Sequence, residues 1–429
     1  MQSSVFKETE IGMIPEDWEL LKVGTIGKVI TGKTPPTKEK SFYGLDFMFV
    51  KIPDMGSTVY VRRTNSMLSK KGAEYMKRLR LPKESIMISC IATIGNVTIA
   101  SEDCFTNQQI NSIIPNEKVT PKWVYYFFKN NKDYLASRGG GGSVYTNISK
   151  SKFEDLSIAV PQINEQTAIS KILFDLDAKI ELLQQQNKTL ENIGKAIFKQ
   201  WFVDFEFPDE QGNPYKSSGG EMVESKLGEI PKGWDKLSLI DIVKHLKPGT
   251  NYQPKRVESG IPFINVRNIQ NGFLTLTNVK YITKDEYNRV HKMWEPEEND
   301  LLITRIGTLG NVGVIRKKDL PVAVHYNSIS IKVKNTSFQF LYFLFISDFF
   351  QKQYHFRKKQ SVQEYVTIDE VEKIKIFLPK ENLVFDRLQN SFNILFDKIK
   401  INSDNIENLI IIRDSLLPKL MTGKIRVNI

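Results

Sequence analysis

The sequence predicts an α+β protein with two mixed α/β globular domains. The domains are expected to be related by pseudo-twofold symmetry and separated by two long antiparallel helices that form a coiled coil. Three observations support this prediction. The chain has 429 residues, more than one ordinary hydrophobic core holds. Its motifs occur twice in the same order. Two stretches keep an unbroken heptad pattern.

The composition is typical of a soluble globular protein with an anionic partner. The net charge is +11 and the pI is about 9.2, which favours nucleic acid, although a basic protein without such a partner is the alternative. Two cysteines, Cys90 and Cys104, are too few for a disulfide framework. With no signal peptide at the N-terminus, they predict a reduced, cytoplasmic setting. The most apolar run, Phe338–Phe350, is too short to span a bilayer, so a buried helix and no membrane contact are expected.

The repeat is visible as short motifs that return about 216 residues later. IGMIPEDW at 11–18 returns as LGEIPKGW at 227–234, ATIGNV at 92–97 as GTLGNV at 307–312, and NSI at 111–113 as NSI at 327–329. YTNIS near Ile148 parallels YVTID near Ile368, and each leads to a short apolar strand and a proline. The shared order predicts two copies of one fold.

Each copy ends in a long heptad-patterned helix. The two seams step by three and four residues through Ile169, Leu173, Leu176, Ile180, Leu183, Asn187, Leu190, Gly194 and Ile197, and through Phe385, Leu388, Phe392, Leu395, Ile399, Asn402, Ile406, Leu409, Arg413, Leu416 and Leu420. An offset of 219 sets Ile180 on Ile399, so the heptad phase is the same in both. This favours pairing of the two helices, although each could instead pack only on its own domain.

An antiparallel register in which paired residue numbers sum to 589 sets Asn187 opposite Asn402. A buried asparagine pair would satisfy itself and penalise slipped registers. The same register sets Leu176 opposite Arg413, whose side chain is then expected to snorkel outward to solvent.

The predicted organisation has five parts. They are a first domain (1–160), a first long helix (161–205), a polar linker (206–226), a second domain (227–380), and a second long helix with a tail (381–429).

Candidate nucleic-acid contacts are basic and amide side chains in both copies. A run of basic residues between Arg62 and Lys83 suggests a phosphate-tracking surface, with a solvated face as the alternative. The glycine-rich loop at 138–142 could approach a ligand closely or be a simple turn. The candidates are Lys33, Arg62, Arg63, Lys70, Lys71, Lys77, Arg78, Asn96, Gln108, Gln109, Arg138 and Asn147 in copy one, and Lys247, Arg267, Asn268, Arg305, Asn311, Asn327, Arg357, Lys358 and Lys359 in copy two.

Signals for catalysis are weak. Residues 27–34 match the phosphate-loop pattern, but Pro35 and Pro36 follow at once where a helix should begin. The four histidines have no metal spacing. A binder without catalysis of its own is expected.

The chain resembles the specificity subunit of type I restriction-modification enzymes. The resemblance rests on IGMIPEDW, TGKTPPT, ATIGNV, FKQWFVDFEFP, LGEIPKGW, the heptad helices, and the tail SLLPKLMTGKIRV, and it extends over essentially the whole chain. It implies that each globular domain is a target recognition domain for one half of a split DNA sequence. The two helices would then fix the distance between the halves.

The resemblance also implies partners. Two methylation subunits would bind this chain, docking on helix surfaces near Trp201–Phe205 and Leu416–Thr422, and restriction subunits would join through them. The chain would hold no cofactor, because S-adenosylmethionine, ATP and magnesium would belong to those partners. Two other interpretations stay open: a coiled-coil scaffold that binds only protein, and an ATPase that uses Lys33.

Overall fold

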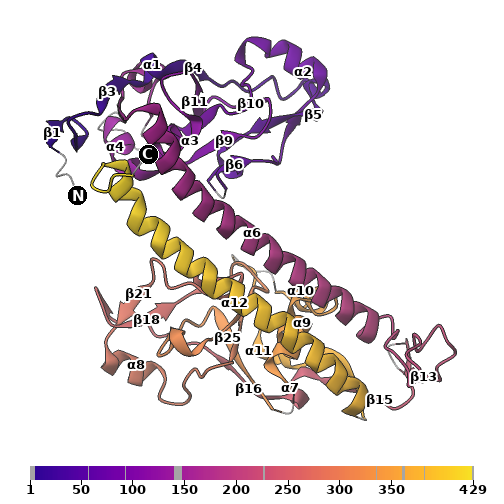
Figure 1. Ribbon diagram of the computed structural model, residues 1–429. Helices are drawn as coiled ribbons and strands as arrows, with labels where there is room; N and C mark the ends of the chain where they lie inside the picture. The colour runs from indigo at the N-terminus through magenta and orange to yellow at the C-terminus, as the bar shows by residue number, and fades with distance from the viewer. Residues whose placement is uncertain are drawn as a thin grey trace. The chain divides into compact units, whose positions relative to one another are not determined.

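The computed structural model describes residues 5–56, 58–91, 93–139, 147–225, 228–334, 336–359, 363–380 and 382–427. The chain forms two compact units (Figure 1). Unit 1 comprises Met1–Gln185 and Ser403–Ile429, and unit 2 comprises Gln186–Asn402. Each unit contains one α/β domain and one half of each long helix. The sequence analysis set the helices apart as separate segments, whereas their apolar side chains belong to the cores of the two domains.

The domain of unit 1 is built on a five-stranded sheet with the order β4-β11-β8-β9-β6. Its strands are β4 (Gly27–Thr31), β11 (Ile110–Pro115), β8 (Ile86–Ser89), β9 (Val97–Ala100) and β6 (Tyr60–Val61). Ile86 and Ile88 pack into one hydrophobic cluster, and Met87 packs into another. Because both faces of β8 are covered, the strand reads as a continuous apolar run instead of an alternating one.

Smaller elements complete unit 1. They are a three-stranded sheet of β10 (Cys104–Thr106), β5 (Tyr43–Val50) and β7 (Met67–Leu68), the ribbons β1 (Phe6–Thr9) with β2 (Gly12–Pro15) and β3 (Glu19–Lys22) with β12 (Ser157–Val160), the helices α1 (Val23–Ile26), α2 (Lys70–Tyr75), α3 (Pro121–Asn130), α4 (Lys132–Arg138) and α5 (Lys150–Glu154), and the 3-10 turns η1 (Lys40–Phe42), η2 (Ile52–Asp54) and η3 (Lys77–Leu79).

The domain of unit 2 repeats this plan around a six-stranded sheet with the order β16-β25-β22-β23-β20-β19. These strands are β16 (Val243–Pro248), β25 (Ser328–Val333), β22 (Leu301–Thr304), β23 (Val312–Val314), β20 (Gly272–Leu274) and β19 (Ile269–Gln270). A four-stranded sheet contains β17 (Arg256–Val257), β21 (Lys280–Ile282), β18 (Ile261–Ile264) and β24 (Ala323–Val324), and the ribbons are β13 (Met222–Ser225) with β14 (Gly228–Pro231) and β15 (Trp234–Ser238) with β26 (Lys375–Pro379).

The helices of unit 2 include the most apolar run of the chain. They are α7 (Leu239–Ile242), α8 (Lys284–Val290), α9 (Phe338–Ile346), α10 (Asp348–Phe356) and α11 (Ile368–Glu372), with the 3-10 turns η4 (Val266–Asn268) and η5 (Lys317–Asp319). The predicted buried helix is α9, and the run breaks at Ser347, whose hydroxyl caps α10 by accepting from Phe350 N. Among the described residues, no helix is long and apolar enough to cross a bilayer.

The two long helices are α6 (Ile163–Phe202) and α12 (Asn382–Met421), each of 40 residues. In unit 2, the Asn402 amide donates to Asn187 Oδ1 at 2.9 Å, and Asn187 Nδ2 donates to the carbonyl of Ile399 at 3.3 Å. In unit 1, Arg413 Nη1 donates to Asp177 Oδ1 at 2.7 Å. The antiparallel pairing and the predicted asparagine register are therefore confirmed.

The seam agrees with the pattern except at one position. All of the predicted seam residues that pair the helices are buried or half-buried. Arg413 was expected to snorkel outward, and this expectation is wrong. Its guanidinium turns inward to the buried carboxylate of Asp177, because an ion pair is available there that the heptad pattern does not show.

The segment predicted as a linker is partly structured. β13 pairs with β14, starting at Met222 opposite Pro231, as β1 pairs with β2 in unit 1. Phe207 stacks on Tyr215 at 4.6 Å and on Trp234 at 5.1 Å between ring centroids. The second copy therefore begins before residue 227, and part of the polar stretch before it packs on that copy.

The C-terminal tail packs on the first ribbons of unit 1. Arg426 donates to both carboxylate oxygens of Asp17 and to the buried Glu165. Gly423 has φ +68° and lies against Pro15 and Trp18, so a larger residue would clash there. The tail thereby connects α12 to β2 and to the start of α6.

Candidate nucleic-acid interface

The same hairpin loop occurs once in each domain. In unit 1, β8 ends at Ser89, whose Oγ accepts from Asn96 N at 2.9 Å and donates to the carbonyl of Thr93. In unit 2, β22 ends at Thr304, whose Oγ1 accepts from Asn311 N at 2.9 Å and donates to Thr308 O at 2.5 Å. The loops at 93–96 and 308–311 are therefore each fixed by one hydroxyl in the same way.

The strand register around these loops corrects the sequence alignment. Ser89 pairs with Ile110, and Thr304 pairs with Ser328, so β11 and β25 are related by 218 residues while β8 and β22 are related by 215. The match of NSI at 111–113 with NSI at 327–329 is therefore wrong by two residues. Asn111 lies inside β11 and donates to Ile148 O, whereas Asn327 precedes β25.

The register sets Arg305 at the place of Cys90. Cys90 N donates to Gln109 O at 2.9 Å, and Arg305 N donates to Asn327 O at 2.8 Å. On the other side, Ile148 N donates to Cys90 O, and Val366 N donates to Arg305 O. The two backbones are held alike, but one presents a thiol whose pKa burial raises to about 11, and the other presents a guanidinium.

The basic run of unit 1 is divided between paired and unpaired side chains. Arg62 Nη1 forms an ion pair with Glu181 of α6 at 3.0 Å. Lys77 pairs with Glu74 at 2.6 Å, and the Lys71 ammonium lies 2.9 Å from Ser41 Oγ. The exposed cations Arg63, Lys70 and Arg78 form no ion pair with the described residues, and they are the better candidates for phosphates.

The region of the apparent phosphate loop has no helix after its lysine. β4 ends at Thr31, and Lys33 N donates to Thr106 O at 3.0 Å outside any helix or strand. Thr34 Oγ1 donates to Gln108 Oε1 at 2.6 Å, so that amide is engaged within the domain. The ammonium of Lys33 is exposed, 5.9 Å from the ring of Tyr75. The absence of a helix here supports the rejection of a nucleotide site.

The remaining candidate side chains of copy one differ in whether they are already paired within the domain and in how exposed they are. Gln109 Oε1 accepts from the buried Asn107 at 2.9 Å. Arg138 pairs with Glu10 at 3.1 Å. Asn96 is half-buried, and Asn147 is exposed beside Ile91. Residues 140–146, which include Gly140–Gly142 of the glycine-rich loop, lie outside the described part of the chain.

In copy two, Asn268 is committed to the fold. It is 3% exposed, its Oδ1 accepts from Asn265 N, and its Nδ2 donates to Thr275 O, so it caps η4 and has no free amide for a base. Lys247 and Arg267 are exposed. The cations of the 357–359 segment include Arg357, which donates to Gln353 O, Lys358, which pairs with Glu364, and Lys359, which is exposed.

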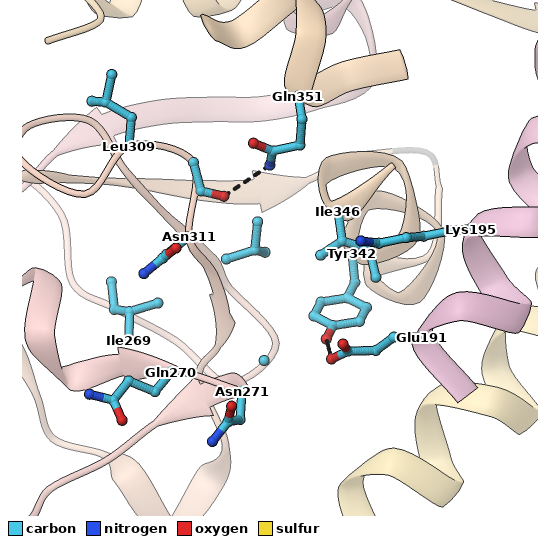
Figure 2. A pocket seen from close by; sticks show the side chains of 13 residues that line it. Glu191, Lys195, Ile269, Gln270, Asn271, Leu309, Asn311, Tyr342, Ile346 and Gln351 are labelled. Carbon is cyan, nitrogen blue, oxygen red and sulfur yellow. Dashed lines mark hydrogen bonds between the residues drawn. The ribbon is translucent and has the colours of Figure 1, made fainter. Parts of the chain in front are cut away.

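A pocket of about 580 Å³ lies between the hairpin loops of unit 2 and α6 (Figure 2). The amides of Gln270, Asn271 and Asn311 line one side, and Glu191 and Lys195 line the other. The sequence analysis found only Asn311 here. The Asn-Gly dipeptide at 271–272, where Asn271 has φ +50°, is the signal that could have indicated the β19–β20 turn.

The scattered histidines show no metal site among the described residues. Burial lowers the pKa of His291 to about 4, and its ring nitrogens lie near Trp294 O and Val324 N. It is a neutral structural histidine.

Comparison with known proteins identifies the family. The family model for the type I restriction modification DNA specificity domain matches residues 15–192 and again 231–411. The specificity subunit of the type I restriction enzyme MjaIX from Methanocaldococcus jannaschii is 31% identical over 98% of this chain and 96% of its own length. The specificity subunit of HindI from Haemophilus influenzae is 39% identical over 42% of this chain and 38% of its own length.

A solved structure has the same fold. It is the type I restriction-modification S subunit from M. genitalium, with a TM-score of 0.53, 16% identity, and coverage of 96% of both chains. Two matched domains, a relative that is similar along the full length, and the shared fold agree with one another. This chain belongs to the family of type I restriction-modification DNA specificity subunits.

Proposed function

We propose that each α/β domain of this chain reads one half of a split DNA target. The observation that carries the proposal is the pair of equivalent hairpin loops, which share one backbone scaffold and differ in side chains, most clearly at Cys90 and Arg305. A constant scaffold with different side chains is what two readers of different base sequences require. The chain would recognise DNA and leave catalysis to other subunits.

The two long helices act as the spacer in this proposal. The hydrogen bond between Asn187 and Asn402 holds one register, because a slipped register would leave an amide buried against Leu or Ile. A constant register gives a constant distance between half-sites. Two domains related by a pseudo-twofold axis would suit half-sites roughly one DNA turn apart, about 34 Å.

Phosphate contacts in this proposal come from the exposed cations. Arg63, Lys70 and Arg78 in unit 1, and Arg267 and Lys359 in unit 2, are exposed. Each cation placed on a phosphate releases a counterion, so binding should weaken steeply with salt.

Methylation subunits are the proposed partners of the helices. The ends near Trp201–Phe205 and Leu416–Thr422 are mostly filled by core side chains, including Phe202 and Leu420. Exposed apolar residues lie elsewhere: Ile394 is 72% exposed, and Ile401, seven residues later on the same helix face, is 54% exposed. We expect two methylation subunits to cover such residues and restriction subunits to join through them. S-adenosylmethionine, ATP and magnesium would bind in those partners.

The decisive experiment is co-expression with the methylation subunits, followed by mapping of methylated adenines in the host DNA. The expected result is one split sequence, of which one half changes when residues 1–160 are exchanged for those of a relative. A contiguous sequence, or a change in both halves, would contradict the proposal.

Two alternatives are tested with the same material. A scaffold that binds only protein would give a complex whose DNA affinity does not depend on salt. An ATPase that uses Lys33 would lose nucleotide binding in Lys33→Ala, whereas a specificity subunit would be unaffected in that assay.

A further inference from the structure

We propose that Arg305 and Asn327 form the base-reading pair of the second domain, and that they recognise one G·C base pair in its half-site. The inference rests on the proposed function. Arg305 begins the loop that follows β22, and Asn327 lies just before the paired strand β25. They are neighbours across the sheet, since Arg305 N donates to Asn327 O at 2.8 Å.

The backbone at Arg305 is hydrogen-bonded to the chain on both sides of it. Arg305 O accepts from Val366 N at 3.0 Å, and Ile306 bridges to Tyr365. The preceding residue, Thr304, accepts the hydroxyl of the buried Tyr354 at 3.0 Å. A reading residue needs such support, because base discrimination depends on small differences in geometry.

One side-chain atom of each residue, in contrast, has no hydrogen-bond partner among the described residues. Arg305 Nε and Asn327 Oδ1 are both buried, and neither has a hydrogen bond. The guanidinium of Arg305 forms no ion pair with the described residues, although unit 2 has many carboxylates. An unpaired buried donor and an unpaired buried acceptor each destabilise the free protein. A ligand whose binding supplied both partners would therefore be favoured.

The equivalent place in the first domain is closed. Cys90 replaces Arg305, and its Sγ accepts from Asn111 Nδ2 at 3.4 Å. Gln109 replaces Asn327, and its Oε1 accepts from Asn107 at 2.9 Å. The scaffold therefore does not require the unpaired groups of unit 2. They are a property of this domain's own side chains, as expected of residues that set the sequence read by one domain only.

The chemistry of the pair matches one base pair. In the major groove, guanine offers two acceptors, N7 and O6, and its paired cytosine offers the N4 amino donor beside them. The arginine fork supplies two donors to guanine, and the asparagine oxygen can accept from cytosine N4. A free asparagine alone would favour adenine, but the adjacent guanidinium would then face the adenine amino group, which is a donor.

The test uses the complete complex with its methylation subunits, and it compares wild type with Arg305→Ala, Arg305→Lys and Asn327→Ala. For each, we would map the methylated sequence in host DNA and measure methylation rates on duplexes that carry single base-pair changes in the second half-site. The expected result is that one G·C position becomes degenerate, with the preference over a changed base pair falling roughly 10- to 100-fold. Arg305→Lys should fail like Arg305→Ala, because lysine keeps the charge but lacks the two-pronged fork.

Controls separate this from folding and from phosphate binding. Lys334→Ala removes an exposed cation of the same unit and should leave the sequence unchanged. The first half-site, read by the other domain, reports whether each variant is folded and assembled. A second half-site without a G·C pair would overturn the proposal. So would a uniform loss that Arg305→Lys restores, which is the behaviour of a phosphate contact. If the wild-type complex methylates no split sequence, the proposed function itself fails. If it does and Arg305→Ala reads the same sequence, only this inference fails.

Discussion

The aromatic helix of each domain packs on the long helices by different chemistry. In unit 1, Tyr126 of α3 donates to Asp177 Oδ2 of α6 at 2.9 Å, and Lys129 lies 3.1 Å from the same oxygen. Arg413 of α12 binds the other oxygen of Asp177 at 2.7 Å. Asp177 is 5% exposed, so this contact is a buried cluster of one carboxylate, two cations and a hydroxyl.

In unit 2, the corresponding contact is aromatic. The ring of Phe343 in α9 lies against Gly194 of α6 and stacks on Phe392 of α12 at 4.6 Å. The offset of 219 that sets Ile180 on Ile399 also sets Gly194 on Arg413. The same seam position therefore carries an arginine where a carboxylate lies opposite, and a glycine where a ring needs the space.

This difference shows how a duplicated fold can make each copy pack on its own part of the long helices. A buried charge is tolerated only when its counter-charge is present. An aromatic ring can pack against the helix at Gly194 only because glycine has no side chain that would fill the space. A single substitution therefore cannot convert the charged contact of unit 1 into the aromatic contact of unit 2, or the reverse. Arg413 thus favours packing against the first domain, and Gly194 favours packing against the second.

The largest expected effect is the loss of the carboxylate in unit 1. Asp177→Ala leaves Lys129 half-buried without its counter-charge and leaves Arg413 only its pair with the exposed Asp414. It should lower the free energy of unfolding by about 3 to 5 kcal/mol. Urea unfolding of the full chain would measure it. Asp175→Ala, which breaks the exposed pair with Lys171, should cost less than about 1 kcal/mol. If both variants lost the same unfolding free energy, the buried cluster around Asp177 would contribute no more than an exposed ion pair.

The matching change in unit 2 is steric. Gly194→Leu forces a side chain into the ring of Phe343, which a Cβ would already approach to 2.1 Å. We expect a loss of about 3 kcal/mol in unfolding free energy, measured as above, and faster amide hydrogen exchange in α9. Ala196→Leu on the exposed face of the same helix is the control and should change stability by no more than about 0.5 kcal/mol. If Gly194→Leu left the unfolding free energy unchanged, the packing of Phe343 on Gly194 would not matter for stability.

A buried carboxylate of unit 2, Asp300, sharpens the contrast, because it forms no ion pair with the residues that the structure describes. Asp300 is 1% exposed and accepts from Glu297 N at 3.0 Å, and burial raises its pKa from 3.8 to about 6. The folded state therefore binds the proton more tightly, and stability falls as pH rises from about 4 to 6. Asp300→Asn should match wild type near pH 3.5 and be more stable by about 2 to 3 kcal/mol above pH 6.5.

Thermal unfolding across pH would measure this difference. Asp235→Asn, at an exposed carboxylate of the same unit, should give no such pH-dependent gain. A constant difference between wild type and Asp300→Asn at every pH would mean that the charge of Asp300 is not the cause.

The smallest expected effect is at the asparagine pair. Asn187→Leu leaves the Asn402 amide only its longer contact with Gln186 Oε1 at 3.5 Å, and it should lower stability by about 1 to 2 kcal/mol. The double variant Asn187→Leu with Asn402→Leu should regain stability. It should no longer select one alignment of the two helices, because leucines can pair in any alignment that is shifted by a heptad. Disulfide trapping between cysteines at 190 and 399 should then become less selective. Gln184→Leu, at an exposed position, is the control, and undiminished selectivity in the double variant would show that other contacts hold the register.

Much of the fold followed from local patterns. The heptad seams predicted both long helices, because the period of an α-helix is set by its own backbone geometry. The antiparallel register was a hypothesis that rested on placing Asn187 opposite Asn402. The repeat predicted two domains of one design. These features depend on residues that are close in sequence or on exact internal copies, which a single sequence contains.

Other features were decided only by tertiary structure. Arg413 turned inward because Asp177, one position off the seam, lies there with Tyr126. Asn327 and Asn111 separated because the offset between the copies grows from 215 to 218 residues between paired strands. Asn268 proved to be a cap, and the unpaired groups of Arg305 and Asn327 became visible only when β22 and β25 were paired.

The sequence by itself determined the helices, their register and the duplicated plan, since periodicity is a local property. Tertiary structure decided which polar side chains are hydrogen-bonded within the fold and which are exposed or without a partner among the described residues. Hydrogen-bond partners lie far apart in the chain, and an insertion of a few residues changes which side chains meet.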